Sequence, residues 1–162
     1  MDLERCDYMI KQVTGNIMDA KEGIICHQVN TRAVMGGGLA LQIRNKYPNT
    51  YKRYVSFCSR HKSSELLGKV LFTQENKLIA NIFGQNDYGC NKQQTDYEAL
   101  EKGLNSVKCV ASGEDNHLYT YSVAIPYSIG CGLGGGDWNI VYKIIEKVFN
   151  NVDFDVVIYK LQ

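Results

Sequence analysis

The order of apolar and polar positions predicts alternating strands and helices. Residues 8–13 alternate weakly between the two kinds of position, which predicts a short strand. Residues 23–29 (GIICHQV) are mostly apolar, as in a strand buried on both faces. Residues 39–47 read as a helix that ends before Pro48, because proline disfavours helix in the residue preceding it. A second helix is expected over residues 50–60.

The middle of the chain predicts two further strands and a helix. Residues 69–73 and 78–83 are strand candidates, joined closely enough to form a hairpin. Residues 86–94 are polar and without periodicity, which predicts a loop. Thr95 and Glu98 have the spacing of a capping box, in which each side chain satisfies a backbone N–H at a helix start. A helix is therefore expected to begin at Thr95.

The last part of the chain repeats strand and helix once more. Residues 119–125 predict a strand closed by Pro126. Asp137 is a good N-cap for a helix with an apolar face, and residues 155–159 predict the final strand. This order predicts an α/β fold, a three-layer α/β/α sandwich with a central mixed sheet. Residues 1–162 contain no linker or repeat, so we expect one domain.

Composition narrows the class of protein. The 162 residues are 44% hydrophobic and 22% charged, as in a globular domain. The net charge of +1 predicts no basic field that draws the chain to nucleic acid or to an anionic membrane. The short runs Lys52-Arg53 and Arg60-His61-Lys62 are interpreted as solvated helix faces. A bound polyanion must therefore be held by local groups.

The cysteines and the N-terminal residues favour a reduced cytoplasmic protein. The cysteines are scattered without a C-x-x-C pair, and Cys26 lies in an apolar run where a free thiol packs well. The first residues have no apolar signal core, and no apolar run reaches the length of a membrane span. No His, Cys, Asp and Glu cluster has metal-ligand spacing, so we expect no metal and no cofactor. A monomer is expected.

Two glycine-rich runs suggest a diphosphate site. Gly36-Gly37-Gly38 and residues 130–136 (GCGLGGG) each stand between a probable buried strand and a probable helix. Glycine lets backbone N–H groups approach a ligand, and a helix start adds the positive end of its dipole. Neither run fits the G-x-G-x-x-G or G-K-[ST] nucleotide patterns. The alternative is that both are tight turns without a ligand.

Four segments in this order resemble the macrodomain family. They are Gly15-Asn16-Ile17, residues 27–43 (HQVNTRAVMGGGLALQI), residues 125–138 (IPYSIGCGLGGGDW) and residues 156–160 (VVIYK). The chain is most similar to the branch that contains the terminal ADP-ribose glycohydrolases and the DNA-ADP-ribosyl antitoxins. The ADP-ribose-1″-phosphate phosphatases are close relatives. The resemblance implies that the partner is ADP-ribose or an ADP-ribosylated substrate, and nucleic acid only when it is ADP-ribosylated.

The resemblance also implies positions for the parts of ADP-ribose. Asn16 and Ile17 would lie at the adenine, with Tyr159 stacked on it, and Asn30 would face the distal ribose. The other implied binding residues are Met35, Gly36, Gly37, Gly38, Leu39, Ala40, Phe83, Gln85, Ile129, Gly130, Cys131, Gly132, Leu133, Gly134 and Gly135. Without the resemblance, Tyr159 could equally be a core or rim aromatic residue. Asn30 could serve only to stabilise a turn through its side chain.

The chain departs from the family pattern where the chemistry is expected. Many macrodomains have aspartate at the position of Asn16, although an asparagine carbonyl can also accept from the adenine amine. The glycohydrolases of this branch have a lysine just after the strand at residues 78–83, and some have an aspartate at the position of Gly134. Here the first region reads Phe83-Gly84-Gln85. The lysine–aspartate mechanism therefore does not carry over.

His27 and Asp137 are the remaining candidates for catalysis. A histidine accepts and returns a proton near neutral pH, as hydrolysis of a phosphomonoester or glycosidic bond requires. His27 could equally be a core histidine, and Asp137 could orient a water or act only as a helix N-cap. Gln85 could hold a water but cannot take its proton. Cys131 has no neighbouring base in the sequence and is interpreted as a packing residue.

Two functional hypotheses follow. The first is a hydrolase of an ADP-ribose derivative, either ADP-ribose-1″-phosphate or an ADP-ribosylated macromolecule. The second is a module that binds ADP-ribose or a related nucleotide without turnover. His27 favours the first hypothesis, while Gly134 and the absent lysine favour the second. A purely structural protein would leave both glycine runs unexplained.

Overall fold

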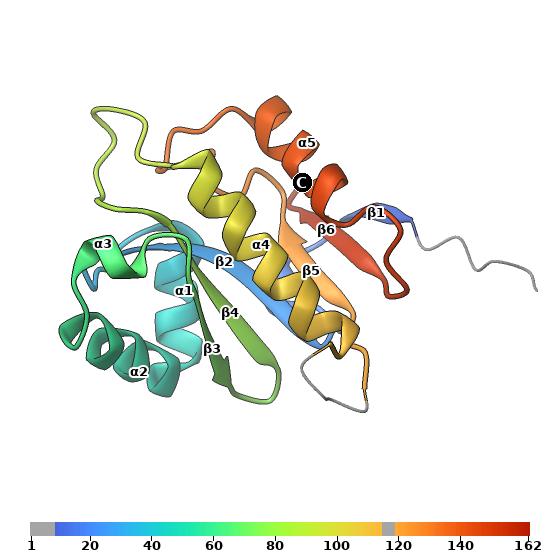
Figure 1. The fold of residues 1–162 in the computed structure, drawn as a ribbon, viewed down its shortest axis with the longest axis horizontal. Helices are drawn as coiled ribbons and strands as arrows, with labels where there is room; N and C mark the ends of the chain where they lie inside the picture. Colours follow the sequence, from blue (N-terminus) through green and yellow to red (C-terminus); the bar gives the residue numbers. More distant parts are fainter. Residues whose placement is uncertain (1–8, 115–118) are drawn as a thin grey trace, which may run out of the picture.

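A six-stranded mixed sheet forms the centre of the chain (Figure 1). The computed structural model describes residues 9–114 and 119–162. The strand order is β1-β6-β5-β2-β4-β3. All neighbouring strands are parallel except β3, which runs antiparallel to β4. The strands are Ile10–Thr14 (β1), Ile24–Asn30 (β2), Val70–Gln74 (β3), Leu78–Gln85 (β4), Val123–Pro126 (β5) and Val156–Lys160 (β6).

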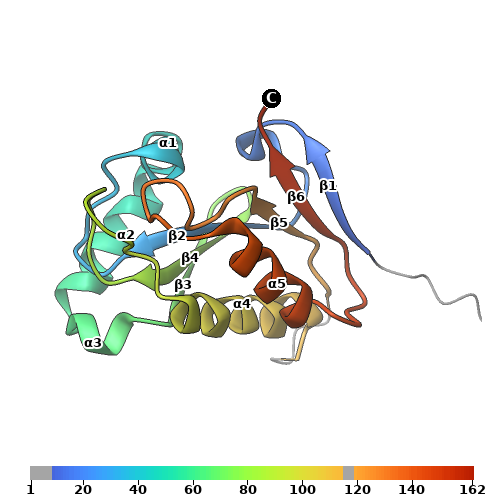
Figure 2. The same cartoon turned by 90° about the horizontal axis from the view of Figure 1, so that it is seen from above.

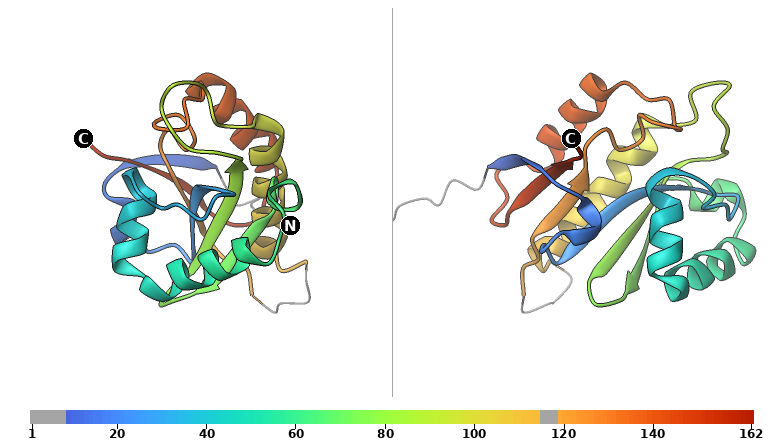
Figure 3. Two further views of the ribbon diagram at one scale, coloured as in Figure 1. Left: turned by 90° about the vertical axis from the view of Figure 1, so that its left-hand side faces the viewer. Right: turned by 180° about the vertical axis from the view of Figure 1, so that it is seen from behind.

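Helices cover both faces of the sheet (Figures 2 and 3). They are Gly38–Lys46 (α1), Pro48–Ser59 (α2), Ser63–Leu66 (α3), Tyr97–Ser112 (α4) and Trp138–Val148 (α5), with a 3-10 turn at Ile17–Asp19 (η1). On β2, Ile24 and Cys26 pack in the core beneath α4 and α5. Ile25 and Val29 pack on the opposite face, toward α1 and α2. The predicted three-layer α/β/α sandwich is confirmed.

The two predicted helix caps have different outcomes. The Asp137 carboxylate accepts a 2.8 Å hydrogen bond from the Asn139 N–H, so this N-cap is confirmed. The capping box at Thr95 is wrong, because the N-cap of α4 is Asp96. Thr95 instead pairs with Gln85 in an isolated bridge. Its hydroxyl donates to the Gly130 carbonyl at 2.6 Å, so a tertiary contact has replaced the local cap.

The predicted element boundaries shift by a few residues. The predicted strand start at Tyr8 lies outside the described residues, and β5 begins only at Val123. The short elements η1 and α3 have too few residues to produce a periodic pattern. In the part of the chain that the structure describes, none of the helices has the length and apolar character that a bilayer crossing requires.

Candidate functional site

Two glycine loops meet at the carboxyl edge of the parallel strands. The first glycine loop, residues 31–37, joins β2 to α1, and the second glycine loop, residues 127–137, joins β5 to α5. Because β2 and β5 are parallel neighbours, both loops leave the same edge of the sheet. A Cβ added to Gly37 would lie 2.8 Å from Cδ1 of Leu133. The loops therefore approach each other closely.

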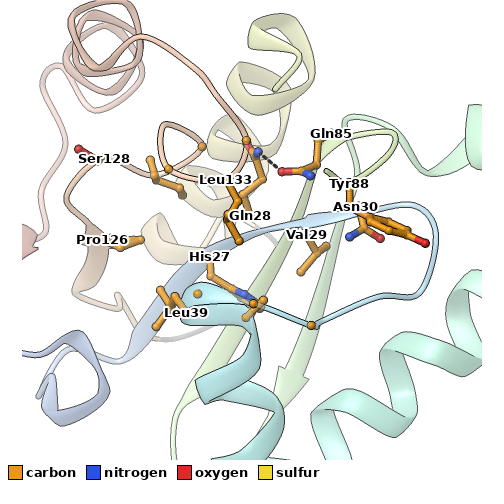
Figure 4. Close-up of a pocket in the computed structure, with 18 of the residues that line it drawn as sticks. His27, Gln28, Val29, Asn30, Leu39, Gln85, Tyr88, Pro126, Ser128 and Leu133 are labelled. Atoms are coloured by element: carbon orange, nitrogen blue, oxygen red, sulfur yellow. Dashed lines mark hydrogen bonds between the residues drawn. The ribbon is translucent and has the colours of Figure 1, made fainter. Parts of the chain in front are cut away.

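Both loops line one cavity of about 560 Å³ (Figure 4). The cavity also touches the end of β4 and the segment at Tyr88, Gly89 and Cys90, within the loop predicted over residues 86–94. The predicted site residues that line it are His27, Asn30, Gly36, Gly37, Gly38, Leu39, Ala40, Gln85, Ile129, Gly130, Gly132, Leu133 and Gly134. The structure thus brings together most of the residues predicted around the diphosphate and the distal ribose.

A second cavity of about 410 Å³ adjoins the first. Gly38, Leu39, Pro126 and Tyr127 line both cavities, so the two are continuous along one edge of the sheet. Asn16, Ile17 and Tyr159, the residues predicted at the adenine, line the second cavity. The predicted positions therefore follow one another along a single surface.

The Tyr159 ring is held from its hydroxyl end. This hydroxyl donates to the Glu22 carboxylate, at 2.7 Å from Oε1 and 2.9 Å from Oε2. Partial burial, together with this carboxylate, raises the pKa of Tyr159 to about 12. The phenol therefore stays protonated at neutral pH and fixes the ring in the wall of the second cavity. Asn16 is exposed, and its Oδ1 accepts from the Met18 N–H at 3.0 Å.

Five predicted site residues do not line either cavity. The side chains of Met35 and Phe83 are fully buried in the core with Tyr54, because their apolar surface packs under α2. Asp137 is exposed at the start of α5 and acts as its N-cap. Gly135 lies against the backbone at Gln93. The thiol of Cys131 donates to the Ile129 carbonyl at 3.4 Å, and burial raises its pKa to about 11, which makes it a poor nucleophile.

The Asn30 side chain organises the start of the first glycine loop. Its Oδ1 accepts from the Arg32 N–H at 3.0 Å and from the Tyr54 hydroxyl at 3.0 Å. Its Nδ2 donates to the Val34 carbonyl at 2.8 Å. Both ends of this amide are therefore engaged in the turn. The role of Asn30 in the turn is therefore confirmed. Asn30 also lines the cavity, and its position at the distal ribose stays a prediction.

His27 lies inside the sandwich on the α1 side of β2, between Ile25 and Val29. It is 1% exposed, and its Nε2 is 2.6 Å from Oδ1 of Asn81. Asn81 Nδ2 donates to the Leu71 carbonyl at 2.8 Å and to Oγ1 of Thr73 at 3.2 Å. The Asn81 oxygen is therefore the acceptor, and Nε2 of His27 carries the proton.

The other nitrogen of His27, Nδ1, is buried and has no hydrogen-bond partner within the described residues. Burial lowers the pKa of His27 to about 4, and the bond to Asn81 offsets only part of this effect. The imidazole is therefore neutral at pH 7. It can accept a hydrogen bond through Nδ1 but holds no extra proton to give to a leaving group.

A chain of uncharged side chains joins the strand ends to the second glycine loop, and two of its residues, Gln28 and Thr95, were not predicted as site residues. Gln28 Nε2 donates to Gln85 Oε1 at 2.7 Å and to Thr95 Oγ1 at 2.9 Å. Thr95 in turn donates to Gly130. Gly130 has φ +73°, and a Cβ there would lie 2.9 Å from Gln28 Oε1. The signal in the sequence is Gln28 itself, a polar residue within a mostly apolar strand.

The side chains that line the first cavity carry no formal charge at neutral pH. The described lining residues include amides, hydroxyls, glycines and aliphatic groups, but no Asp, Glu, Lys or Arg. Among residues 9–114 and 119–162, no group of three or more His, Cys, Asp and Glu side chains could hold a metal ion. An anion in this cavity would therefore be held by backbone N–H groups and by neutral side chains.

Comparison with known proteins gives a consistent family assignment. The model of the Macro domain family matches residues 26–145. The DNA ADP-ribosyl glycohydrolase of Thermus aquaticus is 28% identical over 147 residues, which cover 90% of this chain and 39% of that protein. The chain thus spans well under half of that relative. The ADP-ribose 1″-phosphate phosphatase of Saccharomyces cerevisiae is 27% identical over 91% of this chain and 97% of its own length.

A solved structure agrees with these sequence matches. The macrodomain of Mycobacterium tuberculosis DarG superposes with a TM-score of 0.78 at 28% identity. The superposition covers 94% of this chain and 97% of that domain. The similarity therefore extends over the sheet, both helix layers and both glycine loops.

Proposed function

This chain belongs to the macrodomain family, and we propose that it binds ADP-ribose or an ADP-ribosyl group and hydrolyses an ADP-ribose derivative. The observation that carries the proposal is the pair of glycine loops on either side of one uncharged cavity. Backbone N–H groups of both loops can bind a diphosphate there without lysine or arginine. Gly37 caps α1 without a side-chain hydrogen bond, so the first N–H groups of α1 are open to such an anion.

The two cavities suggest how the ligand lies. We place the adenine in the second cavity, against Ile17 and the Tyr159 ring, and the diphosphate between the two glycine loops. The distal ribose then lies toward Asn30 and Gln85. The bond from the Tyr159 hydroxyl to Glu22 supports stacking. Because the hydroxyl is already engaged, an adenine base would contact the face of the ring.

In a glycosidic substrate, hydrolysis would break the bond from C1″ of the distal ribose to its substituent as the water oxygen bonds to C1″. In ADP-ribose-1″-phosphate, the water oxygen would bond to phosphorus, and the P–O bond to the ribose oxygen would break. In both cases a proton from water passes to the departing group through solvent. Neutral amides such as Gln85 can orient this water, whereas neutral His27 donates Nε2–H to Asn81 and supplies no acid. Both curated relatives described above carry hydrolase names, one for a glycosidic bond and one for a phosphate ester.

The alternative function is binding without turnover. The uncharged lining of the first cavity favours it, because proton transfer in hydrolysis is usually carried by an ionisable side chain. Such a module would bind ADP-ribose through the same loops and release it unchanged. The two functions therefore differ in chemistry and not in the ligand.

One experiment separates these functions. ADP-ribose binding is measured by calorimetry, and product release is assayed from ADP-ribose-1″-phosphate and from ADP-ribosylated protein and DNA. We expect micromolar binding and release from at least one substrate. Binding without any release would establish the binding module. No detectable ADP-ribose binding would overturn both functions.

We further propose a monomer in the cytoplasm. The exposed thiol of Cys90 and the buried thiol of Cys26 fit a reducing compartment, in which thiols persist. Size-exclusion chromatography with light scattering measures the oligomeric state, and fluorescence microscopy of the tagged full chain measures the location. A stable dimer or a location outside the cytoplasm would contradict this assignment.

A further inference from the structure

The near-zero net charge conceals an uneven distribution of charge along the chain. No Asp or Glu occurs from residue 23 to residue 64, whereas the rest of the chain holds all 17 of them and eleven Lys and Arg. This acid-free stretch contains seven basic residues, which we call the basic layer: Arg32, Arg44, Lys46, Lys52, Arg53, Arg60 and Lys62. The expectation of no basic field considered only the total charge.

The fold gathers the basic layer on one side of the molecule. All seven residues are exposed. They belong to the first glycine loop, to α1 and α2, and to the turn before α3, which lie together on one side of the sheet (Figure 3). On α2, Thr50 and Tyr54 point into the core, so Lys52 and Arg53 lie on the outward face.

In the described part of the chain, none of these side chains forms an ion pair with a carboxylate, although the Glu65 carboxylate accepts from the Lys62 backbone N–H at 3.1 Å. The salt bridge found there, Lys147–Glu101, belongs to the opposite helix layer. Within the basic layer, Arg44 lies 4.1 Å from the Tyr51 ring centroid, and Lys46 Nζ donates to the Met18 carbonyl at 2.6 Å. These contacts leave the positive charges unpaired. Unpaired cations clustered on one face are the electrostatic feature of a nucleic-acid surface.

One residue of the basic layer, Arg32, lies close in sequence to the Asn30 end of the first cavity. The Tyr54 hydroxyl, from α2, donates to the Asn30 carbonyl at 2.7 Å. Arg32 follows two residues after Asn30, in the first glycine loop. A long polyanion that contacts both α2 and Arg32 would therefore reach the end of the cavity at which we place the distal ribose.

We propose that the basic layer binds the phosphate backbone of nucleic acid and so presents an ADP-ribosylated nucleotide to the cavity. Presentation of an ADP-ribosylated nucleotide to the cavity rests on the proposed function, but binding of the phosphate backbone to the basic layer does not. The outward positions of α2 are polar, including Asn49, Ser56 and Ser59, so this face lacks the apolar side chains that insert into a membrane. The partner chemistry is a regular array of phosphodiesters.

The test measures binding of unmodified nucleic acid to the full chain. Fluorescence anisotropy uses labelled single-stranded DNA of about 20 nucleotides, and RNA of the same sequence, between about 50 mM and 200 mM NaCl. The variant is Lys52→Gln, Arg53→Gln and Arg60→Gln combined. The matched control is Lys102→Gln, Lys143→Gln and Lys147→Gln, three exposed lysines of the α4–α5 layer.

We expect the α2 variant to bind DNA or RNA at least fivefold more weakly. Its slope of log K against log salt should fall by about 2, because each lost phosphate contact on a single strand removes about 0.7. The control should stay within twofold. The proposal is overturned if the parent binds neither nucleic acid, if the control weakens equally, or if anionic vesicles bind the parent and nucleic acid does not.

Calorimetry with ADP-ribose separates this result from the proposed function. The α2 variant should retain parental ADP-ribose affinity, which shows an intact fold and cavity. If the parent binds nucleic acid but not ADP-ribose, the proposed function fails while the nucleic-acid surface stands. If it binds ADP-ribose but not nucleic acid, the surface fails alone.

Discussion

Nε2 of His27 lies 2.6 Å from Oδ1 of Asn81 in the interior of the sandwich. A buried chain extends this contact away from the cavity, because Asn81 donates to Thr73, and Thr73 Oγ1 lies 2.9 Å from Oγ1 of Thr50. Thr50 also donates to Glu75 at 2.8 Å. His27 is therefore the inner end of a polar network that reaches the β3–β4 turn. This network fixes the proton on Nε2, while burial keeps the imidazole neutral.

Acidification should weaken the fold through His27. Its pKa falls from 6.5 to about 4 on folding, because burial disfavours the charged imidazole. Above pH 6.5 the group is neutral in both states and has no effect. As the pH falls from 6.5 toward 4, the unfolded chain takes up a proton that the folded chain does not. The free energy of unfolding should drop by up to about 3 kcal/mol.

Urea titrations at a series of pH values measure this loss. In His27→Gln, the amide can still donate to Asn81 but has no proton to gain, so the pH dependence over this range should flatten. An equally steep loss in the variant would show that other groups cause it.

Gly37→Glu should abolish ADP-ribose binding. The new side chain would enter the space between the glycine loops, where its Cβ alone would lie 2.8 Å from Cδ1 of Leu133. Its charge would also repel the diphosphate. We expect a loss of at least about 100-fold, equivalent to about 2.7 kcal/mol, by calorimetry. The control is Asn45→Glu, which adds the same charge at an exposed position of α1. Parental affinity in a folded Gly37→Glu protein would place the ligand elsewhere.

Gly134→Asp should destabilise the protein and not supply a catalytic carboxylate. A Cβ at this buried position would lie 2.5 Å from Thr95 Oγ1 and 2.7 Å from the Gly130 carbonyl oxygen. We expect thermal or urea unfolding to show a loss of about 2 kcal/mol or more. Gly132→Asp is the matched control, because nothing lies within 4 Å of a Cβ there. Equal stability of the two variants would show that the second glycine loop adapts easily.

Tyr159 should have separable roles in folding and in binding. Tyr159→Phe keeps the ring but removes the hydroxyl that donates to the buried Glu22 carboxylate, which should cost about 1–3 kcal/mol of unfolding free energy. ADP-ribose affinity should change less than threefold. Tyr159→Ala should lower that affinity at least tenfold, because the base loses its stacking surface. If the two variants bind equally well, the adenine does not stack on this ring.

Much of the fold was predictable because it depends on local patterns. The apolar run of β2 predicts a buried strand, and the periodic apolar face of α5 predicts a helix. Each pattern is complete within a few residues. Asp137 acts as an N-cap because both bonded groups lie within three residues of each other. The glycines of both loops were identifiable for the same reason. Their position between strand and helix predicted the edge of the sheet at which they meet.

The outcome was different wherever long-range contacts compete with local ones. Thr95 has the spacing of a capping box, yet it bonds to Gly130, 35 residues away. Met35 adjoins Gly36 in sequence, but its side chain packs with Tyr54 and Phe83 in the core. The sequence placed His27 in an apolar strand but did not show that Asn81 would fix the imidazole proton on Nε2.

The sequence by itself determined the α/β class, the order of elements and the presence of two glycine loops between strand and helix, because local periodicity and glycine backbone freedom set these features. Only the tertiary structure decided that His27 is a neutral buried group and that Gln28, Gln85 and Thr95 support the second glycine loop. It also gathered the cations of residues 32–62 on one layer. Burial and charge clustering depend on which distant segments the sheet brings together, and a short stretch of sequence does not predict those contacts.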